Sequence, residues 1–99
     1  MDKVTVKIDS DLEELIPGYL ENRHKDIQSI KDNLGSEDFE SIRMLGHSMK
    51  GSGGGYGFEY VSEVGKCIEE AAKVSDVDSI NAQIANLEDY LSRIEVVFE

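Results

Sequence analysis

Tryptophan is absent from this 99-residue sequence, and proline and cysteine each occur only once. A lone cysteine cannot form an internal disulfide, so the chain is not a disulfide-stapled domain, and we expect it to be cytoplasmic. No apolar run reaches the roughly 18 residues that a membrane-spanning helix requires, so we expect no membrane segment. The first residues also lack the apolar core of a signal peptide.

Basic residues are scarce: 10 Lys and Arg stand against 21 Asp and Glu, a formal net charge of −11. A nucleic-acid partner is therefore not expected, because phosphate binding requires a basic face. The acid excess fits either simple solubility or an acidic docking surface, and charge alone does not decide between them.

The apolar residues that are present, 39% of the chain, suffice for one folded domain over residues 1–99. Apolar and polar side chains alternate from Val4 to Asp9 without an obvious partner strand, which predicts that residues 1–9 form an extended arm laid on the domain. A capping-box pattern beginning at Ser10 predicts a short helix, which ends before Pro17.

From Pro17 onward, apolar residues recur every three to four positions, the spacing of amphipathic helices. We expect helices over residues 17–34, from the cap at 36–38 through Tyr56, from about Glu59 to Val74, and from Ile80 to the end of the chain. Each has a polar face, and the connections are short. The sequence therefore predicts an all-α fold: an antiparallel four-helix up-down bundle over about 10–99, with a short extra N-terminal helix.

Residues 45–57 are the most unusual part of the chain, because they contain six glycines together with His47 and Lys50. Each glycine inside a helix costs about 1 kcal/mol relative to alanine. A bare main chain beside a histidine therefore needs a reason.

Helical spacing places His47 about 160° from Leu45 and Met49, which lie on the apolar stripe, so the imidazole should point outward. A neutral imidazole is a nucleophile near pH 7, and nearby cations would stabilise an anion formed on it. This set suits reversible acceptance of a phosphoryl group, with bare backbone for a partner to approach. The other residues expected on or near this face are Arg43, Met44, Lys50, Gly51 and Gly54.

Other familiar sites fit poorly. Lys50 precedes Gly51, the wrong order for a Walker A loop, and a helix rather than a strand precedes the glycines. His24 and His47 lack zinc-site spacing, so we expect no metal. Cys67 is predicted to be a core residue on the apolar side of its helix rather than a nucleophile.

Three residues keep two interpretations. Arg23 lies on an apolar stripe and either reaches solvent at the bundle edge or helps His47 to hold a phosphate. Tyr56 fits the core better than a site. Gly57 either ends a helix or allows close helix packing, and Gly65 is a second candidate for close packing.

The segment His47-Ser48-Met49-Lys50-Gly51-Ser52, followed by Tyr56-Gly57, resembles the signature of histidine-containing phosphotransfer (HPt) domains. Gly53, Gly54 and Gly55 depart from the family pattern, which usually has other small or polar residues there. The resemblance implies a four-helix bundle whose exposed histidine exchanges a phosphoryl group with the aspartate of a receiver domain.

By the same resemblance, Lys50 would steady the phosphate and Gly51 would leave room for the receiver. Mg²⁺ and most catalytic groups would belong to the receiver, so the chain would need no cofactor and act as a carrier rather than a stand-alone catalyst. We expect a monomer. The alternatives are a docking module for a receiver or histidine kinase that transfers nothing, and, more weakly, a metal or haem bundle.

Overall fold

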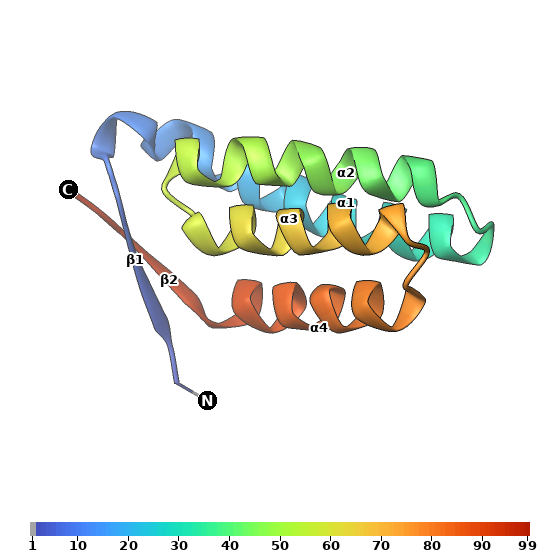
Figure 1. Ribbon diagram of the computed structural model, residues 1–99. Coiled ribbons are helices and arrows are strands. Elements are labelled where there is room, and N and C mark those ends of the chain that lie inside the picture. Colours follow the sequence, from blue (N-terminus) through green and yellow to red (C-terminus); the bar gives the residue numbers. More distant parts are fainter. Residues whose placement is uncertain (1) are drawn as a thin grey trace.

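Four long helices lie side by side in the computed structural model, which describes residues 2–99 (Figure 1). Short connections make successive helices antiparallel, as predicted for an up-down bundle. None of the helices within the described residues is both long and apolar enough to cross a membrane. The helices are α1 (Ile16–Gly35), α2 (Phe39–Gly53), α3 (Glu59–Lys73) and α4 (Val77–Arg93), with short 3-10 segments at Ser10–Leu15 and Gly54–Tyr56.

Aspartate side chains begin three of the helical segments. Asp38 and Asp76 each accept a hydrogen bond from a main-chain N–H in the first turn, at Ser41 and Ser79 respectively, both at 3.1 Å. The short N-terminal helix is capped by Asp9, which accepts from the N–H of Asp11 at 2.9 Å. The cap is therefore Asp9 instead of the predicted Ser10.

The two ends of the chain form a feature that the sequence did not predict correctly. The N-terminal arm is extended but has a partner: β1 (Val4–Ile8) pairs in parallel with β2 (Ile94–Phe98). The last helix therefore ends at Arg93 instead of continuing to the end of the chain. Ile94, Val96 and Phe98 satisfy a strand period as well as a helical one, and the adjacent N-terminal strand selects the strand.

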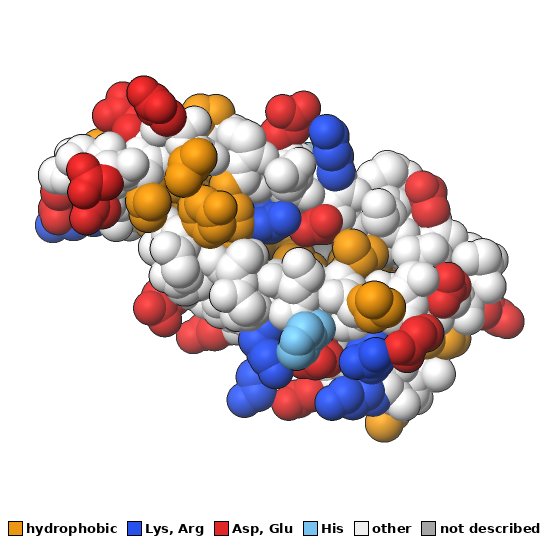
Figure 2. Space-filling view, turned by 90° about the horizontal axis from the view of Figure 1, so that it is seen from above, with side chains coloured by type: hydrophobic (Ala, Val, Ile, Leu, Met, Phe, Trp, Pro, Cys, Tyr) orange, Lys and Arg blue, Asp and Glu red, His pale blue; other side chains and the backbone are white. Residues whose placement is uncertain are grey.

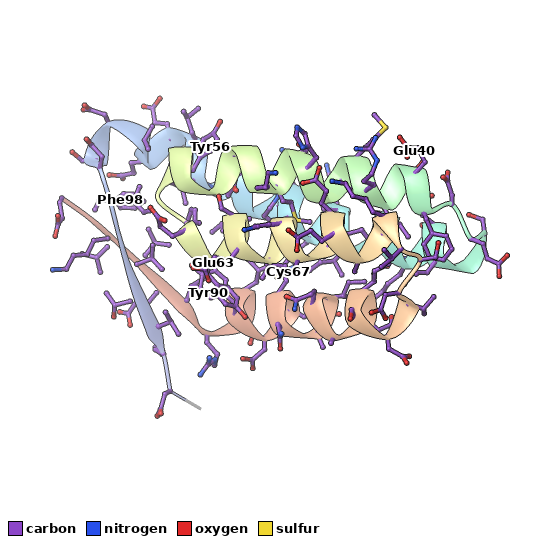
Figure 3. The ribbon with its side chains drawn as sticks, viewed as in Figure 1. Glu40, Tyr56, Glu63, Cys67, Tyr90 and Phe98 are labelled. Atoms are coloured by element: carbon purple, nitrogen blue, oxygen red, sulfur yellow. The ribbon has the colours of Figure 1, made fainter. Side chains whose placement is uncertain are left out.

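Apolar side chains from all four helices and from β1 form one core. The largest fully buried members include Ile30, Ile42, Met49, Phe58 and Leu87. Cys67, which Figure 3 labels on the α4 side of α3, is exposed, so its predicted core position is wrong. Cys67 lies at the edge of the apolar stripe of α3, and the neighbouring Ile68 points into the core.

Glycines allow α2 and α3 to lie closer than helices with side chains between them could. A Cβ on Gly65 would lie 2.5 Å from the main-chain nitrogen of Lys50, and one on Gly46 would lie 2.7 Å from the main-chain nitrogen of Glu69. Gly57 has φ +91°, the left-handed conformation of a helix C-cap, and Ile8 packs directly against it. Gly57 therefore ends a helix, and its close contact is with strand β1 rather than with a second helix, whereas close helix packing explains Gly65.

Candidate functional site

The structure places His47 midway along α2 with 66% of its side chain exposed. The helix buries Ile42 and Met49 against the bundle. His47 consequently faces away from the core and is open to a second protein.

Glu69 on α3 is the functional candidate that the sequence analysis missed. Its side chain is only 7% exposed and lies between two residues of α2: Oε2 is 2.9 Å from Nδ1 of His47, and Oε1 is 3.0 Å from Nζ of Lys50. Hydrogen bonding by Lys50 lowers the pKa of Glu69, and the bond with His47 lowers it further, against the opposing effect of burial. Glu69 is therefore a carboxylate at neutral pH.

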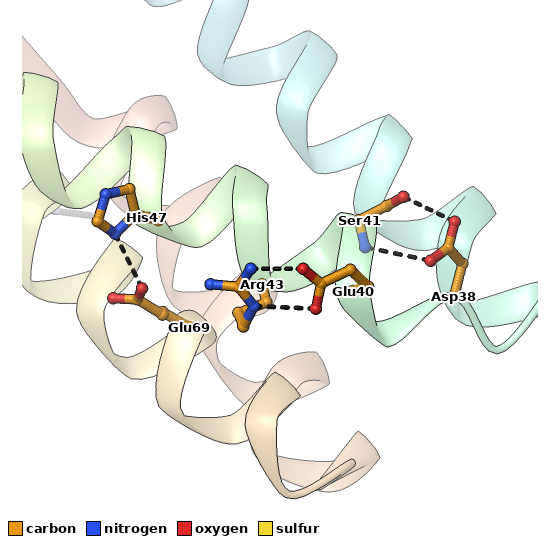
Figure 4. Close-up of polar contacts among 6 residues, drawn as sticks. All are labelled: Asp38, Glu40, Ser41, Arg43, His47 and Glu69. Carbon is orange, nitrogen blue, oxygen red and sulfur yellow. Dashed lines mark hydrogen bonds and ion pairs between the residues drawn. The ribbon is translucent and has the colours of Figure 1, made fainter.

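The carboxylate of Glu69 fixes the proton on the imidazole. A carboxylate only accepts hydrogen bonds, so Nδ1 of a neutral His47 must be the protonated, donating nitrogen. The other ring nitrogen, Nε2, then bears an unshared electron pair and points away from Glu69 (Figure 4). The site thus presents a nucleophilic nitrogen to the outside while its partner nitrogen is held.

The two predicted cations have different surroundings. Lys50 is bound to Glu69, whereas Arg43 is turned toward Glu40 one turn earlier, its Nε donating to Oε2 at 3.0 Å (Figure 4). Hydrogen bonds with Glu40 raise the pKa of Arg43. Only Lys50 is therefore joined to the group that contacts His47.

A shallow hollow of about 310 Å³ borders the imidazole and is lined by Arg43, Met44, His47, Ser48 and Glu69. Met44 is 60% exposed, so the hollow has an apolar edge. Figure 2 shows Lys and Arg side chains on both sides of the histidine. Asp and Glu side chains lie among them, and Arg43 and Lys50 are each paired with a carboxylate, so this face carries charges of both signs.

Gly51 and Gly54 are both exposed beside this region. A Cβ on Gly51 would meet nothing within 4 Å, whereas one on Gly54 would lie 3.7 Å from the Ser62 hydroxyl. The surface at Gly51 is thus open, and no packing contact among residues 2–99 explains its lack of a side chain.

Arg23 has a structural environment away from the imidazole. It is 8% exposed, its Nε donates to Asp26 at 2.8 Å, and its guanidinium lies 4.2 Å from the centre of the Tyr19 ring. Tyr56 stacks on the same Tyr19 ring, with the two ring centres 4.3 Å apart. Arg23 therefore forms a buried ion pair instead of reaching solvent at the edge of the bundle. The neighbouring His24 is exposed on α1.

The sequence did contain a signal for Glu69. It follows Ile68 on the apolar side of α3 and comes four residues after Gly65, the glycine that contacts α2. An acid one turn from a packing glycine should face the neighbouring helix. Which helix it faces, and that His47 and Lys50 lie opposite, depends on tertiary packing.

Within residues 2–99, no group of three or more His, Cys, Asp or Glu side chains is placed to hold a metal ion. A family model described as the Hpt domain matches residues 14–96 of the chain. No curated protein matches the chain, and no solved structure does.

Proposed function

Because the chain belongs to the Hpt domain family, whose members take part in histidine phosphotransfer, we propose that it carries a phosphoryl group on Nε2 of His47. The donor or acceptor is the aspartate of a receiver domain. The observation that supports this most directly is the contact of Glu69 with Nδ1 on an exposed ring, because in the neutral imidazole it leaves Nε2 as the nitrogen without a proton.

The transfer requires no proton to leave Nε2. The electron pair of that nitrogen forms a bond to phosphorus, the phosphorus–oxygen bond of the aspartyl phosphate breaks, and its electrons remain on the departing carboxylate. Glu69 accepts the Nδ1 hydrogen bond throughout and stabilises the positive charge that develops on the ring. The return reaction follows the same path backward.

Lys50 supplies the charge that the incoming phosphoryl group needs. Its amine is 3.0 Å from Glu69 in the unphosphorylated protein and is 43% exposed, so it is free to turn toward a phosphoryl group on the neighbouring imidazole. Phosphoryl transfer depends mainly on positioning and charge neutralisation, with Mg²⁺ held by the receiver in this proposal. The chain is thus a carrier whose partner provides most of the catalysis.

The partner docks over α2. The open main chain at Gly51, the exposed Met44 and the Lys and Arg side chains on both sides of His47 suit a receiver whose phosphorylation pocket is acidic. Arg43 lies on α2 and Gly54 at the end of that helix, and these two residues complete the proposed docking surface.

The test is transfer from a phosphorylated receiver to the purified chain. We expect an acid-labile, alkali-stable label on the wild type and on His24→Gln, which changes the second exposed histidine, and none on His47→Gln. A label on His47→Gln would place the site elsewhere. Receiver binding with no label on the wild type would favour the docking module instead.

A further inference from the structure

The hydroxyl of Ser62, on α3, bridges the last turn of α2. It accepts a hydrogen bond from the main-chain N–H of Gly54 at 2.8 Å and donates one to the carbonyl of Lys50 at 2.9 Å. A Cβ on Gly53 would lie 2.5 Å from the Ser62 nitrogen, so the main chains touch there as well. Ser62 therefore holds both ends of one helical turn to the neighbouring helix.

This turn is weak without outside support. Four glycines occur between Gly51 and Gly55, and each costs about 1 kcal/mol relative to alanine in a helix. The last turn of any helix also leaves carbonyls without intrahelical partners. Lys50 belongs to this turn, so fraying of the turn would reach the lysine that the proposed function requires.

We propose that Ser62 is a positioning residue for Lys50, an inference that rests on the proposed phosphocarrier function. α3 then holds Lys50 at two points: Ser62 binds its carbonyl, and Glu69 binds its amine. When a phosphoryl group arrives on His47, the amine exchanges Glu69 for the phosphate while the main chain stays where Ser62 holds it. The lysine pays little ordering entropy at that step because its backbone is already fixed.

A double-mutant cycle on the lifetime of phosphorylated His47 tests this role, using Ser62→Ala, Lys50→Met and the combination. Lys50→Met should shorten the lifetime about tenfold, the order expected for losing a charge-assisted hydrogen bond. Ser62→Ala should shorten it about threefold in the wild-type background and leave it unchanged in Lys50→Met, because coupled residues are not additive. Ser92→Ala is the matched control, since it removes a hydroxyl that donates to Asp89 on α4.

A second measurement is independent of phosphorylation. Hydrogen exchange of the Gly54 amide should be faster in Ser62→Ala than in the wild type and unchanged in Ser92→Ala. Unchanged Gly54 exchange, or a Ser62→Ala lifetime equal to that of the wild type, overturns the role of Ser62 while leaving the carrier function intact. An equal shortening in the Lys50→Met background also overturns it, because the effect would not pass through Lys50. Failure of wild-type His47 to become labelled contradicts the carrier function itself.

Discussion

Replacing Gly65 by alanine tests how closely the site depends on the contact between α2 and α3. The new Cβ would lie 2.5 Å from the main-chain nitrogen of Lys50, 2.7 Å from the carbonyl oxygen of Gly46 and 2.8 Å from Cβ of Met49. Ordinary contact begins at about 3.4 Å, so the helices must separate by about 1 Å. Overpacking of this kind costs up to about 3 kcal/mol, from which the better helix propensity of alanine recovers about 1 kcal/mol.

The expected net loss of about 2 kcal/mol should lower the midpoint of thermal unfolding by roughly 8–16 °C in a domain of this size. Gly51→Ala is the matched control, because its Cβ meets nothing within 4 Å. That variant should gain up to about 1 kcal/mol. Circular dichroism during heating measures both changes.

The same separation should disturb the site. Glu69 lies one turn beyond Gly65, and its contacts with His47 and Lys50 are 2.9 and 3.0 Å, so a shift of about 1 Å exceeds hydrogen-bond range. The Nδ1 proton resonance of His47 should therefore change in Gly65→Ala. A Gly65→Ala protein as stable as the wild type, with the His47 resonance unmoved, would refute the close packing and its link to the site.

Three further predictions concern separate parts of the molecule. Gly51→Leu should fold normally but reduce transfer from a phosphorylated receiver at least tenfold, of the order of one lost docking contact; normal transfer would place docking elsewhere. Glu69→Gln should flatten the loss of stability in acid, measured by urea unfolding from pH 3 to 6. The lowered pKa of Glu69 stabilises the folded state above the unfolded value of 4.5, and that stability disappears as the pH falls through the folded value; identical acid limbs would contradict it. Ile8→Ala should cost about 2–4 kcal/mol in urea unfolding, because Ile8 is buried against Gly57, whereas exposed Val97→Ala should change little.

Local periodicity was enough to predict the four helices. The bounds predicted from apolar spacing agree with α1, α2, α3 and the start of α4 to within three residues. The ends of the chain were harder, because Ile94–Phe98 fits two periods at once. The choice between them depends on β1, which lies some 90 residues away in sequence, so no local rule could make it.

The site divides in the same way. The outward direction of His47 follows from its position on one helix, and so does its proximity to Lys50. The position of Glu69 opposite His47 depends on the register of α2 and α3. Gly46 and Gly65 set that register by allowing the two helices to touch. The glycines that lower the helix propensity of α2 thus have separate explanations: some permit close packing against α3, whereas Gly51 faces open space.

The most direct measurement is the nitrogen to which phosphorus is bound. Nuclear magnetic resonance of the ¹⁵N-labelled chain, phosphorylated by a receiver, distinguishes the ring nitrogens of His47 and of His24. The expected result is phosphorus on Nε2 of His47, with Nδ1 still protonated beside Glu69. Phosphorus on Nδ1 of His47, or on His24, would contradict the account.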